Sequence, residues 1–263
     1  MLSRLTRPQA VAVCALPAVA LLATAVFAPL PFTVAQPGLT ANVLGDHQGT
    51  PVITISGAPV RTTSGQLRMT TIEATSPNTH VSLGDVIDGW FDTDRAIMPR
   101  DAVYPSGESV KEIEKHNARQ MQQSQNAATR AALRYLKLGG EDVKVTLTLA
   151  DVGGPSAGLL FTLGIIDKLD GDGGGGDLTG GRTIAGTGTI TADGTVGPVG
   201  GVALKTQAAR RDGATVFLVP RAECADARAE LPRGLRLVPI TTLQGAVNAL
   251  TALEKDKGAV PSC

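Results

Sequence analysis

A strand followed closely by a strongly apolar helix is the feature that most constrains the fold. Residues 143–149 (VKVTLTL) alternate valine, leucine and threonine, which is typical of a β-strand. Residues 159–169 (LLFTLGIIDKL) are apolar on nearly every face, which predicts a helix buried on all sides. A chain of 263 residues with 43% hydrophobic content is long enough to build one sizeable domain around such a helix. Residues 52–55 and 67–74 suggest a pair of strands. Further strand and helix patterns follow, so the sequence predicts a mixed α+β fold.

The turn between these two elements carries an isolated serine. Ser156 lies in the run Gly-Gly-Pro-Ser-Ala-Gly of residues 153–158. A hydroxyl at the N-terminus of a helix can attack a carbonyl carbon while nearby backbone N–H groups hold the developing oxyanion. The alternative is that Ser156 only caps the helix, because serine is a favoured N-cap residue. This segment alone does not decide between the two.

A catalytic histidine is not the expected partner of this serine. The Gly-x-Ser-x-Gly turn of α/β-hydrolases requires a histidine after the serine in the chain. His47, His80 and His116 all precede Ser156, so that order is excluded. His47 and His80 lie in loop-like sequence and His116 lies among charged residues, so we expect all three to be solvated.

Lysine is the remaining candidate base. Lys168, Lys205, Lys255 and Lys257 follow Ser156, and the last two lie in a polar tail. Lys168 lies near the end of the helix that follows the serine. Lys205 opens an alanine-rich helix, and its apolar neighbours predict burial, which can lower a lysine pKa by up to about 3–5 units. A neutral amine can then accept the serine proton. The alternative for Lys205 is a surface lysine on a short helix.

In combination, these segments resemble the proteolytic domain of the Lon protease family. Members of this family are serine peptidases with a Ser-Lys dyad. The segment GGPSAGLLFTLGIID resembles the nucleophile motif, with Ser156 at the serine. The segment IAGTGTITADGTVGPVGGVALK resembles the second motif, with Lys205 as the base and Thr187 as the threonine that orients the lysine. The resemblance covers roughly residues 52–253. It implies a serine endopeptidase.

The oxyanion hole is expected to come from the backbone next to the nucleophile. The backbone N–H groups in the region of Gly154, Pro155 and Ser156 are the candidates.

The chain also departs from the family pattern. Many Lon proteases carry an aspartate three residues before the serine, where this chain has Gly153. No Gly-x-x-x-x-Gly-Lys-Ser/Thr phosphate loop occurs, so we expect ATP-independent activity. The membrane-anchored relatives usually carry a PDZ domain, and the short segment from Leu138 to Val143 leaves no room for one. The resemblance also implies a ring-shaped homo-oligomer, a hexamer.

The N-terminal region predicts a membrane anchor. Residues 10–28 are apolar and uncharged, and a bilayer span needs roughly 20 such residues. Arg4 and Arg7 precede this stretch and no lysine or arginine follows until Arg61, so the positive-inside rule places the N-terminus in the cytoplasm and the rest outside. The alternative is a signal peptide cleaved after residues 33–35 (TVA), which would give a secreted protein. We expect an uncleaved, single-pass anchor in the cell membrane.

Charge and cysteine usage exclude several other functions. Lysine plus arginine and aspartate plus glutamate both total 24, and aromatic residues make up only 3%, so no nucleic-acid partner is expected. Cys224 and Cys263 would face an oxidising exterior, where they can pair or remain two free thiols. Neither cysteine has partners at metal-ligand spacing, so we expect no metal and no cofactor.

The predicted organisation is a cytoplasmic N-terminus (1–9), a transmembrane signal-anchor (10–28), a linker (29–50), a Lon-like proteolytic domain (51–253) and a polar tail (254–263). The predicted function is an ATP-independent serine endopeptidase acting on unfolded or peptide-like proteins. The alternative is a Lon-fold binding or regulatory protein without catalysis. The presence of Ser156, Lys205 and Thr187 together favours the enzyme.

Overall fold

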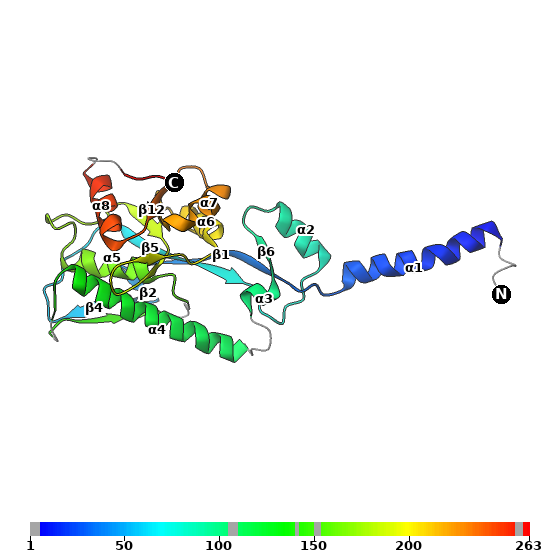
Figure 1. Cartoon of the computed structure of the whole chain (residues 1–263), viewed down its shortest axis with the longest axis horizontal. Coiled ribbons are helices and arrows are strands. Elements are labelled where there is room, and N and C mark those ends of the chain that lie inside the picture. The colour runs from blue at the N-terminus through cyan, green and yellow to red at the C-terminus, as the bar shows by residue number, and fades with distance from the viewer. Residues whose placement is uncertain (1–5, 105–109, 140–141, 150–153, 256–259) are drawn as a thin grey trace. The chain divides into compact units, whose positions relative to one another are not determined.

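The computed structural model describes residues 6–104, 110–139, 142–149, 154–255 and 260–263 (Figure 1). The chain forms two compact units. The N-terminal unit combines Met1–Gln36 with Ala74–Gly107, and the main unit combines Pro37–Glu73 with Glu108–Cys263. One chain segment therefore leaves the main unit after Glu73 and returns to it at Glu108.

The N-terminal unit contains the long helix α1 and a small group of elements. Its elements are α1 (Arg7–Phe27), the first residues of β1 (Phe32–Asn42), α2 (Leu83–Phe91), β6 (Ala96–Pro99) and α3 (Arg100–Val103). Strand β6 pairs antiparallel with β1, with Phe32 opposite Pro99 and Ala35 opposite Ala96. Helix α2 begins with a capping box between Ser82 and Asp85, and it packs on β6.

The main unit is built around a mixed sheet. The strand order is β12-β11-β8-β5-β1, and β1 continues into its pairing with β6. The strands are β5 (Gln66–Ala74), β8 (Thr183–Gly186), β11 (Val216–Pro220) and β12 (Arg236–Ile240). The β5–β8, β8–β11 and β11–β12 pairs are parallel. Every residue of β11 is buried, as expected for a central parallel strand. The mixed α+β prediction is confirmed.

Three short strand pairs complete the sheets. They are β2 (Asp46–His47) with β3 (Thr50–Pro51), β4 (Ile53–Ser56) with β7 (Lys144–Leu147), and β9 (Thr189–Ile190) with β10 (Val196–Gly197). The sequence suggested that residues 52–55 and 67–74 pair with each other, which is wrong. Strand β4 pairs instead with β7, far away in the chain. Strand pairing is decided by long-range packing, which local alternation of residues does not reveal.

The helices of the main unit surround one apolar core. They are α4 (Val110–Tyr135), α5 (Gly158–Leu169), α6 (Val202–Arg211), the short 3₁₀ helix η2 (Arg221–Glu223), α7 (Cys224–Ala229) and α8 (Leu243–Glu254). Helix α5 is buried from Gly158 to Asp167, as its apolar sequence predicted, and α4 packs along it. Helix α5 is therefore the central support for the turn that precedes it.

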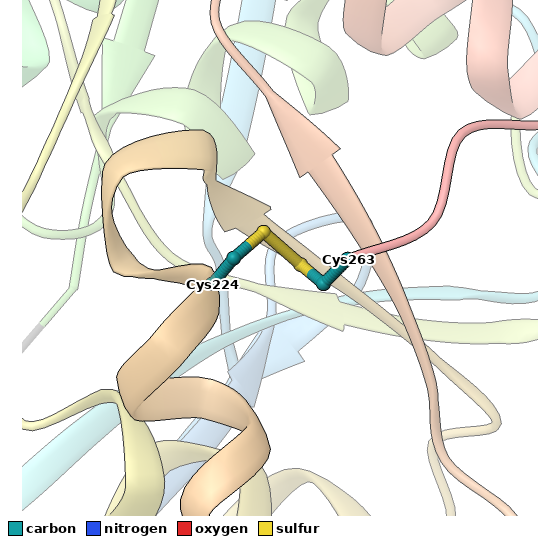
Figure 2. The surroundings of a disulfide bond; sticks show 2 residues. All are labelled: Cys224 and Cys263. Atoms are coloured by element: carbon teal, nitrogen blue, oxygen red, sulfur yellow. A yellow bond between two sulfur atoms is a disulfide. The ribbon is translucent and has the colours of Figure 1, made fainter.

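The structure corrects the expected linker and decides between the two alternatives for the cysteines. Residues 29–50 were expected to be a linker, but residues 32–42 form β1 and take part in the sheet. The polar tail is also fixed at its end, because Cys263 forms a disulfide with Cys224 (Figure 2). Val260 packs against the apolar core of the main unit. The open alternative of two free thiols is thereby excluded.

Candidate active site

Ser156 lies in the turn that leads into α5, and its side chain does not cap that helix. The N-cap residue is Ala157, and the helix start has no side-chain cap hydrogen bond. Ser156 is partly exposed, whereas Ala157 and the helix that follows are buried. The interpretation of Ser156 as a helix cap is therefore wrong. The hydroxyl is held at the border between the core and the solvent.

Helix α4 supports this turn through two hydrogen bonds. The backbone N–H of Gly154 donates to the carbonyl oxygen of Asn117 at 3.2 Å. The hydroxyl of Ser124 donates to the carbonyl oxygen of Pro155 at 3.1 Å. Gly154 has a φ of +88°, in the left-handed region that favours glycine. These contacts fix the backbone on the N-terminal side of Ser156.

Lys205 is buried in the first turns of α6. Only 3% of the residue is exposed. Burial lowers the pKa of Lys205 to about 8, although the negative charge of Glu223 partly opposes this shift. Its Nζ donates a hydrogen bond to Oγ1 of Thr187 at 3.3 Å. The surface-lysine alternative is therefore wrong, and a substantial fraction of the amine is neutral at mildly alkaline pH.

Thr187 connects the lysine to the serine turn. It follows β8 and is fully buried. Its hydroxyl donates to the carbonyl oxygen of Ser156 at 3.3 Å, so the lone pairs of Oγ1 accept from Lys205. The N–H of Gly188 donates to the same carbonyl at 3.0 Å. The three residues singled out by the sequence thus belong to one hydrogen-bonded cluster.

The Ser156 hydroxyl itself has no bond to the lysine. Among the residues that the structure describes, no hydrogen bond joins Oγ of Ser156 to Nζ of Lys205. Catalytic hydrogen bonds are often long in the absence of substrate and shorten when it binds. The assignment of Ser156 as nucleophile, Lys205 as base and Thr187 as orienter stays a prediction that this geometry permits.

The predicted oxyanion hole needs revision. Pro155 has no backbone N–H, and the N–H of Gly154 already donates to Asn117. In the described part of the chain, the N–H groups of Ser156 and Ala157 have no hydrogen-bond partner. These two donors, at the start of α5, replace Gly154 and Pro155 as the candidates. Gly153, where many Lon proteases have an aspartate, lies outside the described residues.

Glu223 is a residue near the site that the sequence reasoning missed. It ends η2 and is 6% exposed. Its carboxylate accepts the N–H groups of Val199 and Gly200, in the loop before α6. The only local signal is an acidic residue shortly after a fully apolar strand, which does not indicate a partner in a distant loop.

A comparison with protein families matches the part of the chain that contains this cluster. Residues 148–251 match the Lon protease (S16) C-terminal proteolytic domain. The matched segment contains Ser156, Thr187, Lys205 and Glu223. No curated protein matches the chain.

The Lon-type match implies a serine peptidase with protein substrates. It covers the part of the main unit from the end of β7 to α8, so the nucleophile turn and the lysine helix both fall within it. Within the described residues, no group of three or more histidine, cysteine, aspartate or glutamate side chains is placed to hold a metal ion.

Proposed function

We propose that the protein is a membrane-anchored, ATP-independent serine endopeptidase that uses Ser156 and Lys205. The observation that carries this proposal is the burial of Lys205, which favours the neutral amine, next to a threonine that is bonded to the nucleophile turn. Among the residues that the structure describes, no acid lies within hydrogen-bond distance of the Lys205 amine. Burial of such a lysine is expensive for the fold, which makes a chemical role its best explanation.

The first half of the reaction forms an acyl-enzyme. Oγ of Ser156 attacks the carbonyl carbon of the scissile peptide while Nζ of Lys205 takes the hydroxyl proton. The carbonyl oxygen becomes an oxyanion, which the N–H groups of Ser156 and Ala157 stabilise. The intermediate collapses when Lys205 gives the proton to the leaving amine, and the new N-terminus departs.

The second half restores the enzyme. Lys205, neutral again, accepts a proton from a water molecule that attacks the ester carbon. The second tetrahedral intermediate collapses, the proton returns to Oγ of Ser156, and the acid product leaves. Thr187 accepts a hydrogen bond from Nζ, which keeps the amine directed toward the nucleophile turn.

The absence of a phosphate-loop motif in this sequence supports ATP-independent cleavage. Without an unfolding motor, a polypeptide must reach Ser156 already extended. Unfolded proteins, loosely folded proteins and peptides are therefore the proposed substrates. A ring of identical subunits is proposed from the family resemblance alone.

Helix α1 supports the proposed anchor. It is long and apolar enough to cross a membrane, and its described side chains are mostly exposed. Signal-peptide cleavage after Ala35 would remove the residues of β1 that pair with β6, which favours an uncleaved anchor. Helix α2 contacts α1. Its Trp90 and Phe91 are 76% and 86% exposed, and aromatic side chains of this kind favour the membrane interface.

Peptide cleavage by the full-length chain tests the catalytic proposal. Ser156→Ala and Lys205→Met should each abolish cleavage of an unfolded protein such as reduced casein, and added ATP should have no effect. Lys168→Met is the matched control, because Lys168 is a half-buried helical lysine whose pKa is also lowered by burial, and it lies at the far end of α5. Unchanged cleavage by the Ser156→Ala protein would contradict the dyad. Absent cleavage by the wild type would favour the non-catalytic binding protein.

The membrane proposal has an internal reporter, because Trp90 is the only tryptophan in the chain. The full-length protein should float with lipid vesicles, and lipids brominated near the headgroup should quench its tryptophan emission. Vesicles without bromine give the reference intensity. A chain that remains in the aqueous fraction would contradict the anchor. A chain that floats without quenching would contradict only the contact between α2 and the membrane.

A further inference from the structure

Glu223 holds a buried carboxylate against the loop that precedes the lysine helix. Its Oε1 accepts the N–H of Gly200 at 2.6 Å, and its Oε2 accepts the N–H of Val199 at 3.1 Å. Hydrogen bonds to an ionised acceptor are roughly twice as strong as those between neutral groups. Both oxygens of a residue that is only 6% exposed are thus committed to one short stretch of backbone.

That stretch determines where α6 begins. Gly200 and Gly201 have φ values of +78° and +66°, so the chain enters the helix through two left-handed residues. Gly201 is the N-cap and has no side chain to satisfy the first N–H groups. Its carbonyl oxygen accepts the N–H of Lys205 at 3.2 Å. The position of Lys205 therefore depends on a loop whose backbone is fixed by hydrogen bonds to the Glu223 carboxylate.

We propose that Glu223 is a positioning residue, whose carboxylate fixes the Val199–Gly200 backbone and thereby directs the side chain of Lys205 toward Thr187. This inference rests on the proposed function, in which Lys205 is the base. A negative charge beside the start of α6 also interacts favourably with the helix dipole. The same charge raises the pKa of Lys205, against the lowering by burial.

The charges around Lys205 make this assignment specific. Among the described residues, Glu223 is the charged group that shifts the pKa of Lys205. Helix α6 packs mainly on α7, β8 and β11, and the two strands carry no charged residue. The other charged residues of α6, η2 and α7 are exposed, namely Arg210, Arg211, Arg221, Asp226 and Arg228.

The first test is the pH profile of peptide cleavage by the full-length Glu223→Gln variant. The alkaline plateau of kcat should fall about tenfold with little change in KM, because the base is displaced from the nucleophile. The acid limb should move to lower pH, because the group that raises the pKa of Lys205 is gone. Glu230→Gln is the matched control, since it removes the same charge from an exposed position at the end of α7. It should leave both quantities unchanged.

The second test does not depend on catalysis. Amide hydrogen exchange of the peptide that contains Val199 and Gly200 should be at least tenfold faster in Glu223→Gln than in Glu230→Gln. Glu223→Asp keeps the charge but shortens the side chain by one methylene, so it should lower the plateau and keep the acid limb near that of the wild type. This variant decides the question if Glu223→Gln does not fold.

The outcomes separate the two proposals. Unchanged exchange, plateau and acid limb in Glu223→Gln would overturn the positioning role, and so would a wild-type plateau in Glu223→Asp. If the wild type cleaves nothing but exchange rises in Glu223→Gln, the proposed function fails while the hold of Glu223 on the loop is supported.

Discussion

The hydroxyl of Thr187 lies 3.3 Å from Nζ of Lys205 and 3.3 Å from the carbonyl oxygen of Ser156. Since the hydroxyl donates its only proton to that carbonyl, its oxygen can only accept from the amine. One buried side chain thus fixes the direction of the lysine and its distance from the serine turn.

Thr187→Val should lower kcat about 2- to 10-fold, because a neutral hydrogen bond of this kind contributes about 0.5–1.5 kcal/mol. Valine keeps the shape of the side chain but can accept nothing from Lys205. Steady-state cleavage of a peptide measures the effect, and KM should change little. Thr187→Ser is the control, since it keeps the hydroxyl. Equal rates for the valine and serine variants would contradict the orienting role.

The cleavage rate should rise with pH and level off above about pH 8. In the proposed mechanism the reacting species is the neutral amine of Lys205, and burial lowers the pKa of this group to about 8. Well below that pH the protonated fraction dominates, so kcat should fall about tenfold for each pH unit. A kcat profile between pH 6 and 10 on a single peptide checks this. An inflection near pH 6.5 would instead indicate a histidine.

Lys205→Met should stabilise the protein at pH 7, although under the proposed mechanism it should also abolish catalysis. The pKa of Lys205 is lower in the folded state than in the unfolded chain, so the unfolded state binds more protons between about pH 8 and 10.5. Burial of the charged lysine therefore costs stability below pH 8, and the cost disappears as pH rises to 10.5. We expect a gain of about 1–3 kcal/mol at pH 7.

Chemical denaturation at pH 7 and at pH 10 measures this difference. The advantage of the methionine variant over the wild type should shrink at the higher pH. A variant that is less stable than the wild type at pH 7 would show that the amine contributes more to packing than its burial costs.

Cys224→Ser should destabilise the fold by about 2–4 kcal/mol. The disulfide joins two residues that are 39 apart in the sequence, and a cross-link over a loop of that length restricts the unfolded chain. Thermal unfolding under non-reducing conditions measures the loss. Cys263→Ser and the double variant serve as controls, and all three should have the same midpoint. A further loss in the double variant would mean that the thiols act separately.

The sequence predicted the parts of the fold that depend on local pattern. The buried helix α5 could be predicted because it is apolar on nearly every face, and the helix with Lys205 because it is rich in alanine. The β4–β7 pairing could not, since it joins Ile53 to Leu147, which lie far apart in the sequence. The involvement of residues 32–42 in the sheet was hidden because Pro37 and Gly38 interrupt the strand pattern.

In the candidate site, too, residues in local motifs could be predicted and long-range contacts could not. Ser156, Lys205 and Thr187 lie in short motifs with a chemical meaning, so the sequence was sufficient to propose them. Glu223 acts on a loop that is more than twenty residues away, and only the folded chain brings them together. The lack of an N–H in Pro155 could have been recognised from the residue type alone.

The disulfide shown in Figure 2 begins one residue after Glu223. The disulfide is therefore attached at the first residue of α7, directly after the 3₁₀ helix η2 whose Glu223 supports the loop before Lys205. In a reducing cytoplasm the two cysteines remain free thiols, so only non-covalent contacts hold the C-terminus against α7. Export to an oxidising compartment would add the covalent bond. The disulfide would then form only after synthesis and export of the proposed peptidase, so the fold would reach its full stability only at its destination.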